Sequence, residues 1–193
     1  MKHHQGRLEV ITGPMFCGKT DELLRRLRRA IIANQKIQVF KPGFDIRYSN
    51  EKVTSHAGNE YDATPIESTT EIPALLINDV TLVAIDEAQF FGEEIIPDVQ
   101  DLVKKGIRVI VGGLDMDFRG EPFGQMPMLL SQAEIVDKLH AICMVCGEEA
   151  TRTQRLVDGN PAHYDDPIII VGASEMYEAR CRIHHQVPSG KKE

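Results

Sequence analysis

The chain has 193 residues, which suits one domain, or one domain with a small appendage, and allows a core without disulfide bonds. Its composition, with 42% hydrophobic and 26% charged residues, is that of an ordinary soluble globular protein. The formal net charge of −7 argues against a surface for nucleic acid, and no apolar run approaches the roughly 20 residues of a transmembrane helix.

The start of the chain predicts a strand, a glycine-rich loop and a helix. Residues 8–11 are a β-prone run, and leucines and isoleucines recur at helical spacing over residues 23–32. Residues 37–40 predict a second strand, and the polar residues 44–61 predict a long, mobile loop. The polar N-terminus has no signal-peptide core, so we expect a cytoplasmic protein. On the helix, a basic cluster is expected to face solvent, with a subunit or phosphate contact as the alternative: Arg25, Arg26, Arg28 and Arg29.

The middle of the chain continues this alternation of strands and helices. Residues 72–77 predict a short helix, and residues 81–86 predict a buried strand that ends in an acid. Residues 93–105 predict a further helix, and residues 107–111 another buried strand. This order predicts an α/β fold with a parallel sheet flanked by helices and a functional site at the carboxyl ends of the strands.

The pattern changes near residue 139, where short segments rich in cysteine and histidine begin. We therefore predict an α/β domain over residues 1–138 and a small, zinc-ribbon-like lobe over residues 139–187. Residues 188–193 are expected to form a disordered tail.

Residues 13–20 read Gly-Pro-Met-Phe-Cys-Gly-Lys-Thr and match the phosphate-loop pattern of P-loop NTPases fully. Glycines let the backbone curl so that its N–H groups point at phosphate oxygens, and the helix N-terminus adds its positive dipole end. The lysine supplies charge at the outer phosphates, and the threonine hydroxyl can hold Mg²⁺. Cys17 is interpreted as a small residue that fits the loop rather than as a reactive thiol. The sequence thus predicts an ATP site made by Gly13, Pro14, Met15, Phe16, Cys17, Gly18, Lys19 and Thr20.

Two adjacent carboxylates follow the buried strand of residues 81–86. Asp86 ends that strand, where such NTPases place the second acid that organises Mg²⁺. Glu87 could orient water, as in a plain ATPase, or take the proton of an acceptor hydroxyl, as in a kinase. The residue pattern alone leaves both roles open. Phe90 and Phe91 are expected in the core, with the wall of a pocket as the alternative.

Four potential metal ligands occur as two pairs with two-residue spacers. Cys143 and Cys146 form the first pair, and Cys181 and His184 the second. Three thiolates and one imidazole make a closed tetrahedral set that suits a structural Zn²⁺. His185 is the alternative fourth ligand, although the spacing of His184 mirrors the first pair.

With these motifs, the chain resembles the thymidine kinases of the zinc-containing, cytosolic type over about residues 8–184. The resemblance depends on the phosphate loop, the metal pairs and four short motifs: Lys-Pro before Asp-Ile-Arg-Tyr at 45–48, Ile-Asp-Glu-Ala-Gln-Phe-Phe at 85–91, Gly-Leu-Asp at 113–115 and Pro-Phe-Gly at 122–124. It implies a salvage enzyme that transfers the γ-phosphoryl group of ATP to the 5′-hydroxyl of thymidine, giving dTMP, with deoxyuridine as a further substrate. It also implies one structural Zn²⁺ per chain, Mg²⁺ with ATP, inhibition by dTTP and a homotetramer.

The same resemblance implies roles for individual residues. Glu87 would be the general base, and Asp86 would organise Mg²⁺. The ATP and Mg²⁺ side would also include Asp45, Arg47 and Gln89. The thymidine side would include Phe118 stacked on the base, Leu114 and Thr153 in the pocket, and Tyr177 closing over the nucleoside, with Met15 nearby. A strand over residues 168–171 would bind the edge of the base with its backbone, through Ile168, Ile169, Ile170, Val171 and Gly172.

Two other functions compete with this interpretation. An ATPase whose zinc ribbon binds nucleic acid would share the phosphate loop, but the acidic balance and the lack of an aromatic and basic run argue against it. A GTP switch would need a guanine signature of the Asn-Lys-x-Asp type, which the sequence lacks.

Overall fold

The computed structural model describes residues 6–43, 52–54, 60–169 and 176–189. Its centre is a six-stranded parallel sheet in the order β5-β2-β6-β7-β1-β8. The strands are β1 (Arg7–Thr12), β2 (Ile37–Pro42), β5 (Thr64–Ile66), β6 (Leu82–Ile85), β7 (Arg108–Gly113) and β8 (Ile135–Lys138). The predicted α/β fold with a parallel sheet is thereby confirmed.

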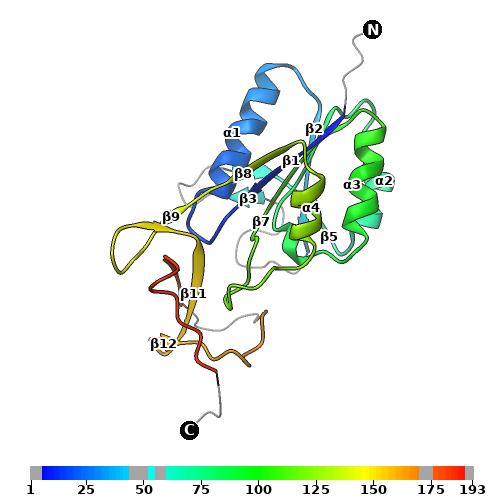
Figure 1. Ribbon diagram of the computed structural model, residues 1–193. Helices are drawn as coiled ribbons and strands as arrows, with labels where there is room; N and C mark the ends of the chain where they lie inside the picture. The colour runs from blue at the N-terminus through cyan, green and yellow to red at the C-terminus, as the bar shows by residue number, and fades with distance from the viewer. Residues whose placement is uncertain (1–5, 44–51, 55–59, 170–175, 190–193) are drawn as a thin grey trace.

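Helices cover both faces of this sheet (Figure 1). On one face lies α1 (Lys19–Ile32), whose leucines pack against Ile11, Val39 and Ile110. On the other face lie α3 (Ile95–Lys104) and α4 (Met126–Gln132), packed against Val10, Val109 and other residues of the same strands. Adjacent residues of one strand therefore pack into the apolar cores on opposite faces of the sheet, because side chains alternate along a strand. Short helical segments complete this layer: η1 (Thr69–Glu71), α2 (Ile72–Leu75) and η2 (Ala88–Phe90).

The segment expected to be a long loop contains a small hairpin. Strands β3 (Lys52–Thr54) and β4 (Glu60–Asp62) pair antiparallel, with Val53 opposite Tyr61. Val53 is buried and Tyr61 packs beside it against the α1 core, which explains why these residues are extended. The loop prediction is therefore wrong for both strands, while residues 44–51 and 55–59 lie outside the described residues.

The C-terminal lobe is built from two small antiparallel sheets. One pairs β9 (Ala141–Ile142) with β10 (Glu149–Ala150). The other places β11 (Arg152–Val157) between β12 (Asn160–Pro161) and β13 (Met176–Arg180). The lobe lies on the side of the central sheet at which β1 ends (Figure 1). The carboxyl edge of the sheet and this lobe thus face each other.

Two expectations for this lobe need revision or remain open. Ile168 and Ile169 are not part of a strand, so the predicted strand is wrong for these two residues, and residues 170–172 lie outside the described part of the chain. Pro188, expected to begin a disordered tail, accepts a hydrogen bond from the backbone of Tyr164 at 2.8 Å. Among the described residues, no helix is long and apolar enough to cross a membrane.

A buried charge cluster lies between β1 and α1. Glu9 is only 1% exposed and bonds to three arginines: Arg7 at 2.6 Å, Arg26 at 2.7 Å and Arg108 at 2.6 Å. Arg26 also bonds to Glu22, at 2.8 Å. Of the basic cluster that was predicted to face solvent, Arg26 is buried, whereas Arg25, Arg28 and Arg29 are exposed. Burial alone would raise the pKa of Glu9, but hydrogen bonds and charges from Arg108 and Arg7 lower it to about 2.

We expect Glu9→Gln to lower the free energy of unfolding by about 3 kcal/mol at pH 7. The folded pKa lies below the unfolded value, so this stabilisation is complete above about pH 4.5 and is lost as the pH falls toward 2. Urea denaturation of both proteins across this pH range should show the difference shrinking with acid. Asp101→Asn, which removes an exposed partner of Lys104, should cost under about 1 kcal/mol at any pH. An equal loss in both variants would contradict the assignment.

Candidate active site and metal centre

The phosphate loop connects the end of β1 to the start of α1 (Figure 1). Gly18, directly before the helix, has φ 84°, a left-handed conformation that favours glycine. Gly13 has φ 139°, and a Cβ there would lie 2.3 Å from the carbonyl oxygen of Leu139. A side chain at Gly13 would therefore collide with the chain that enters the C-terminal lobe. Both glycines thus have backbone conformations that other residues adopt only with strain, as the phosphate-loop pattern predicts.

Lys19 is folded back over this loop. Its Nζ donates to the carbonyl oxygens of Pro14, at 2.7 Å, and Gly13, at 3.2 Å, and lies 3.8 Å from the sulfur of Cys17. Burial raises the pKa of the Cys17 thiol although the Lys19 charge opposes this shift. Cys17 is partly buried, and its raised pKa disfavours the reactive thiolate form.

Asp86 and Glu87 lie directly after β6, at the carboxyl edge of the sheet. Asp86 is buried, and one of its carboxylate oxygens accepts the backbone N–H of Glu87 at 3.0 Å. A Cβ on Gly112 would lie 2.9 Å from that oxygen, so the neighbouring strand leaves room for the carboxylate only because it carries glycine there. Glu87 has φ 50° and ψ 40°, a strained left-handed conformation of the kind that clusters at functional sites.

Gln89 fixes the orientation of the Glu87 side chain. Its amide nitrogen donates to the Glu87 carboxylate at 2.5 Å, and its amide oxygen accepts the backbone N–H of Leu114 at 3.0 Å. Gln89 is buried, and a Cβ on Gly113 would lie 2.8 Å from its amide oxygen. Gln89, expected on the ATP and Mg²⁺ side, thus has its amide group held between Glu87 and the backbone of Leu114.

The residues expected around thymidine come from both parts of the molecule. Phe118, in the connection between β7 and α4, is only 4% exposed. Thr153, on β11, accepts the backbone N–H of Met15 at 3.0 Å, so the lobe is bonded directly to the phosphate loop. Tyr177 lies on β13 opposite Arg155 of β11, and Leu114 is held through its backbone by Gln89. Ile168 and Ile169 are exposed. Five other predicted residues lie outside the described residues: Asp45, Arg47, Ile170, Val171 and Gly172.

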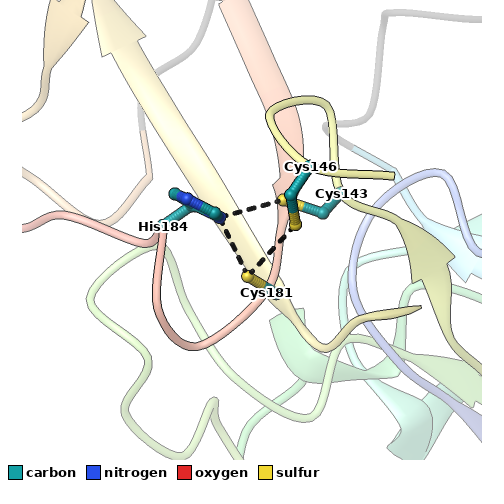
Figure 2. A group of neighbouring side chains, drawn as sticks. All are labelled: Cys143, Cys146, Cys181 and His184. Carbon is teal, nitrogen blue, oxygen red and sulfur yellow. Dashed lines mark hydrogen bonds between the residues drawn. The ribbon is translucent and has the colours of Figure 1, made fainter. Parts of the chain in front are cut away.

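Four side chains converge in the lobe as the two ligand pairs predicted (Figure 2). The sulfurs of Cys146 and Cys181 lie 3.8 Å apart, and Nδ1 of His184 lies 3.2 Å from the sulfur of Cys181 and 3.9 Å from that of Cys143. All four ligand atoms lie within 4.8 Å of one another. Tetrahedral zinc with bonds of about 2.0–2.3 Å places its ligand atoms roughly 3.5–3.8 Å apart. The group therefore fits a structural Zn²⁺.

The structure decides between the two candidate histidines. The ring of His185 points elsewhere, with Nε2 donating to the carbonyl oxygen of Phe118 at 2.8 Å. Burial raises the pKa of the Cys143 thiol, but hydrogen bonds from the backbone of Cys181, Val145 and Cys146 outweigh it and lower the pKa to about 6. A lowered thiol pKa suits a metal ligand, because cysteine binds a metal as the thiolate.

Several contacts at this site have no sequence motif. The bond between Thr153 and Met15 joins residues 138 positions apart. Arg155, which no motif includes, is wholly buried and lies against the ring of Phe118. Polar residues in a short strand normally indicate a solvent face, so no signal in the sequence indicates that this strand faces inward.

Comparisons with known proteins place the chain in a family. Two solved structures resemble it distantly. The ATPase DotB of Legionella pneumophila has 13% identity and a TM-score of 0.46 over 75% of this chain and 43% of that one. Domain III of the replication initiation protein DnaA of Thermotoga maritima has 15% identity and a TM-score of 0.41 over 70% of this chain and 55% of that one. The chain thus spans about half the length of each structure. The family model described as thymidine kinase matches residues 6–185, nearly the whole chain, and the protein therefore belongs to the thymidine kinase family.

Proposed function

We propose that the protein is an ATP-dependent thymidine kinase that phosphorylates the 5′-hydroxyl of thymidine, and also deoxyuridine, in nucleotide salvage. The observation that carries this proposal is the placement of Glu87. It follows β6, which is separated by β7 alone from the strand that ends in the phosphate loop. Parallel strands end at the same edge, so a carboxylate and a triphosphate site lie at one edge of the sheet. Membership of the family supports the choice of thymidine as the acceptor.

The donor side consists of the phosphate loop, Thr20 and Asp86. A bound triphosphate would offer Lys19 anionic oxygens in place of the two loop carbonyls that it now contacts. Asp86 and Thr20 offer the hard oxygen ligands that suit Mg²⁺, which when bound with ATP would neutralise charge on the transferred phosphoryl group. Gly112 leaves the space that keeps the Asp86 carboxylate at this edge. These residues position the donor, which is most of what phosphoryl transfer requires of a protein.

Glu87 is the general base in this proposal. As the 5′-oxygen of thymidine attacks the γ-phosphorus, the hydroxyl proton passes to the Glu87 carboxylate, and the bond to the β-phosphate oxygen breaks to leave ADP. Gln89 donates to one carboxylate oxygen of Glu87, and this hydrogen bond restrains the Glu87 side chain in its position. A base must be held within hydrogen-bonding reach of the proton that it takes, and Gln89 supports that role.

The lobe supplies the acceptor side. Phe118, Leu114, Thr153, Tyr177 and the segment 168–172 would surround the nucleoside, with Zn²⁺ holding the lobe together. The hydrogen bond from Met15 to Thr153 supports this arrangement, because it ties the acceptor lobe to the donor loop. Closure of the lobe would exclude water and so limit ATP hydrolysis without an acceptor. Inhibition by dTTP, a homotetrameric state and a cytoplasmic location are part of the same proposal and follow from the resemblance.

A nucleoside panel tests the proposed function. With ATP and Mg²⁺, we expect thymidine and deoxyuridine to give monophosphates and stoichiometric ADP, with no product from purine nucleosides. ADP release that needs no nucleoside and rises with added DNA would instead support a nucleic-acid-dependent ATPase. In a competition assay, tighter binding of GTP than of ATP would support a GTP-binding switch.

A further inference from the structure

The central strand of the lobe's three-stranded sheet directs two buried side chains at the rest of the molecule. Thr153 and Arg155 are two positions apart on β11, so they lie on the same face of the strand. Thr153 contacts the phosphate loop through Met15, and Arg155 contacts Phe118, which follows β7. This face of β11 is therefore one of the surfaces through which the lobe contacts the α/β domain.

Among the residues that the structure describes, Arg155 is the largest fully buried side chain, with 0% of its surface exposed. The central carbon of its guanidinium group lies 4.0 Å from the centre of the Phe118 ring, a cation–π contact. Its Nη1 donates to the carbonyl oxygen of Pro167 at 2.6 Å, and Nη2 lies 3.9 Å from the carboxylate of Asp166. One guanidinium group thus contacts both an aromatic ring and a backbone carbonyl 12 positions along the chain.

A second arginine, which follows Phe118 in the chain, also contacts both the Phe118 ring and the segment of Asp166 and Pro167. Arg119 lies 5.5 Å from the Phe118 ring centre and 4.7 Å from the Tyr164 ring centre, and its Nη2 donates to the carbonyl oxygen of Asp166 at 3.0 Å. The backbone of Asp166 and Pro167 is therefore held by two arginines, and each of them also contacts Phe118. The ring and this short segment form one connected unit.

This unit joins two elements that, in the proposed function, bind the nucleoside. Phe118 is the ring expected to stack on the base, and Asp166 and Pro167 lead directly into Ile168 and Ile169, which are expected along its edge. We propose that Arg155 is a positioning residue for thymidine: its guanidinium group fixes the Phe118 ring and the segment of Asp166 and Pro167 relative to each other. This inference rests on the proposed function of those two elements.

The chemistry of the position requires an arginine. A buried cation is costly to desolvate, and an apolar side chain of similar volume often stabilises a protein as well or better. Lysine would keep the charge, but its ammonium group has no plane that can stack on a ring while donating along its edge. If Arg155 only filled space in the core, methionine could replace it without loss of thymidine binding. If it orients both elements, neither methionine nor lysine could replace it.

The test compares Arg155→Met and Arg155→Lys with the wild-type chain. We expect Arg155→Met to raise the KM for thymidine, and its Kd by calorimetry, about tenfold, because a desolvated cation–π contact and a hydrogen bond are lost. The KM for ATP should change less than about twofold, and kcat should fall little, as expected when uniform binding is lost. Arg155→Lys should show most of the same loss. Arg182→Met, which removes an exposed positive charge from the same lobe, should leave both KM values unchanged.

Zinc content and the unfolding temperature show whether each variant is folded. If Arg155→Met does not fold, Arg155→Lys decides the outcome alone. Thymidine binding that stays unchanged in a folded, zinc-loaded variant would overturn the proposal, as would a parallel rise of the KM for thymidine and for ATP. A wild-type protein that binds no thymidine would instead refute the proposed function itself, so the two failures are distinguishable.

Discussion

Glu87→Gln is expected to lower kcat for thymidine phosphorylation by about 10²-fold or more, with nucleotide binding largely intact. Glutamine keeps the size of the side chain and an oxygen that can accept from Gln89, so the geometry beside Asp86 should persist. What it removes is the ability to take a proton from the acceptor hydroxyl. Initial rates with saturating ATP and thymidine measure the loss, and titration with a non-hydrolysable ATP analogue measures nucleotide binding.

Glu93→Gln provides the matched control for this experiment. Glu93 is an exposed glutamate six positions further along the chain, so the substitution makes the same chemical change away from the proposed site. Its kcat should stay within about twofold of the wild-type value. A near-normal kcat for Glu87→Gln would remove Glu87 from the role of general base, and a kcat loss accompanied by an equal loss of nucleotide binding would point to damage of the donor site.

Removal of the metal is expected to destabilise the C-terminal lobe, so that it unfolds at a lower temperature than the α/β domain. Among the described residues, the apolar cluster around the metal site has only small buried members: the ligand Cys143 and the alanines Ala141, Ala150 and Ala179. Such a cluster offsets only part of the conformational entropy of the lobe, whereas zinc binding contributes on the order of 10 kcal/mol in small metal-folded units. The two large cores of the sheet domain are built from other residues and do not depend on the metal.

Chelation followed by thermal unfolding should therefore give two transitions in place of one. Thymidine phosphorylation should be lost with the first transition, helical circular dichroism only with the second, and added Zn²⁺ should restore the original profile. Cys146→Ser should lack the metal, whereas Cys17→Ser, which changes a cysteine outside the ligand group, should keep one zinc per chain. Metal-free protein that retains full activity and a single transition would contradict the structural role of zinc.

Local patterns predicted much of the fold because their causes are local. The strand, loop and helix around the phosphate loop follow from apolar periodicity and from two glycines that the turn requires. The metal ligands follow from spacing, because each pair lies in one short loop. The carboxylates of Asp86 and Glu87 were found because a buried strand ends in a polar residue. In each case the residues that define the feature are close in sequence.

Features that depend on distant partners were not predicted. Glu9 looks like the solvent-facing residue of a strand, yet it is buried because Arg26 and Arg108 reach it from other elements. The hairpin of β3 and β4 depends on Val53 and Tyr61 packing onto the α1 core. Arg155 is buried through contacts with residues 12 and 37 positions away, and no local property of its strand indicates them.

The hydrogen bond from Met15 to Thr153 has a consequence for how such a protein can evolve. Interfaces between the domains of one chain usually resemble transient protein–protein interfaces, which leave the domains separable. Here a backbone amide of the loop is already used by the lobe, and Gly13 must lack a side chain because Leu139 passes against it. A lobe transplanted onto an unrelated nucleotide-binding domain would find neither feature. The two halves of this chain are therefore expected to be inherited together, and changes at Gly13, Met15 and Thr153 to be tolerated only in combination.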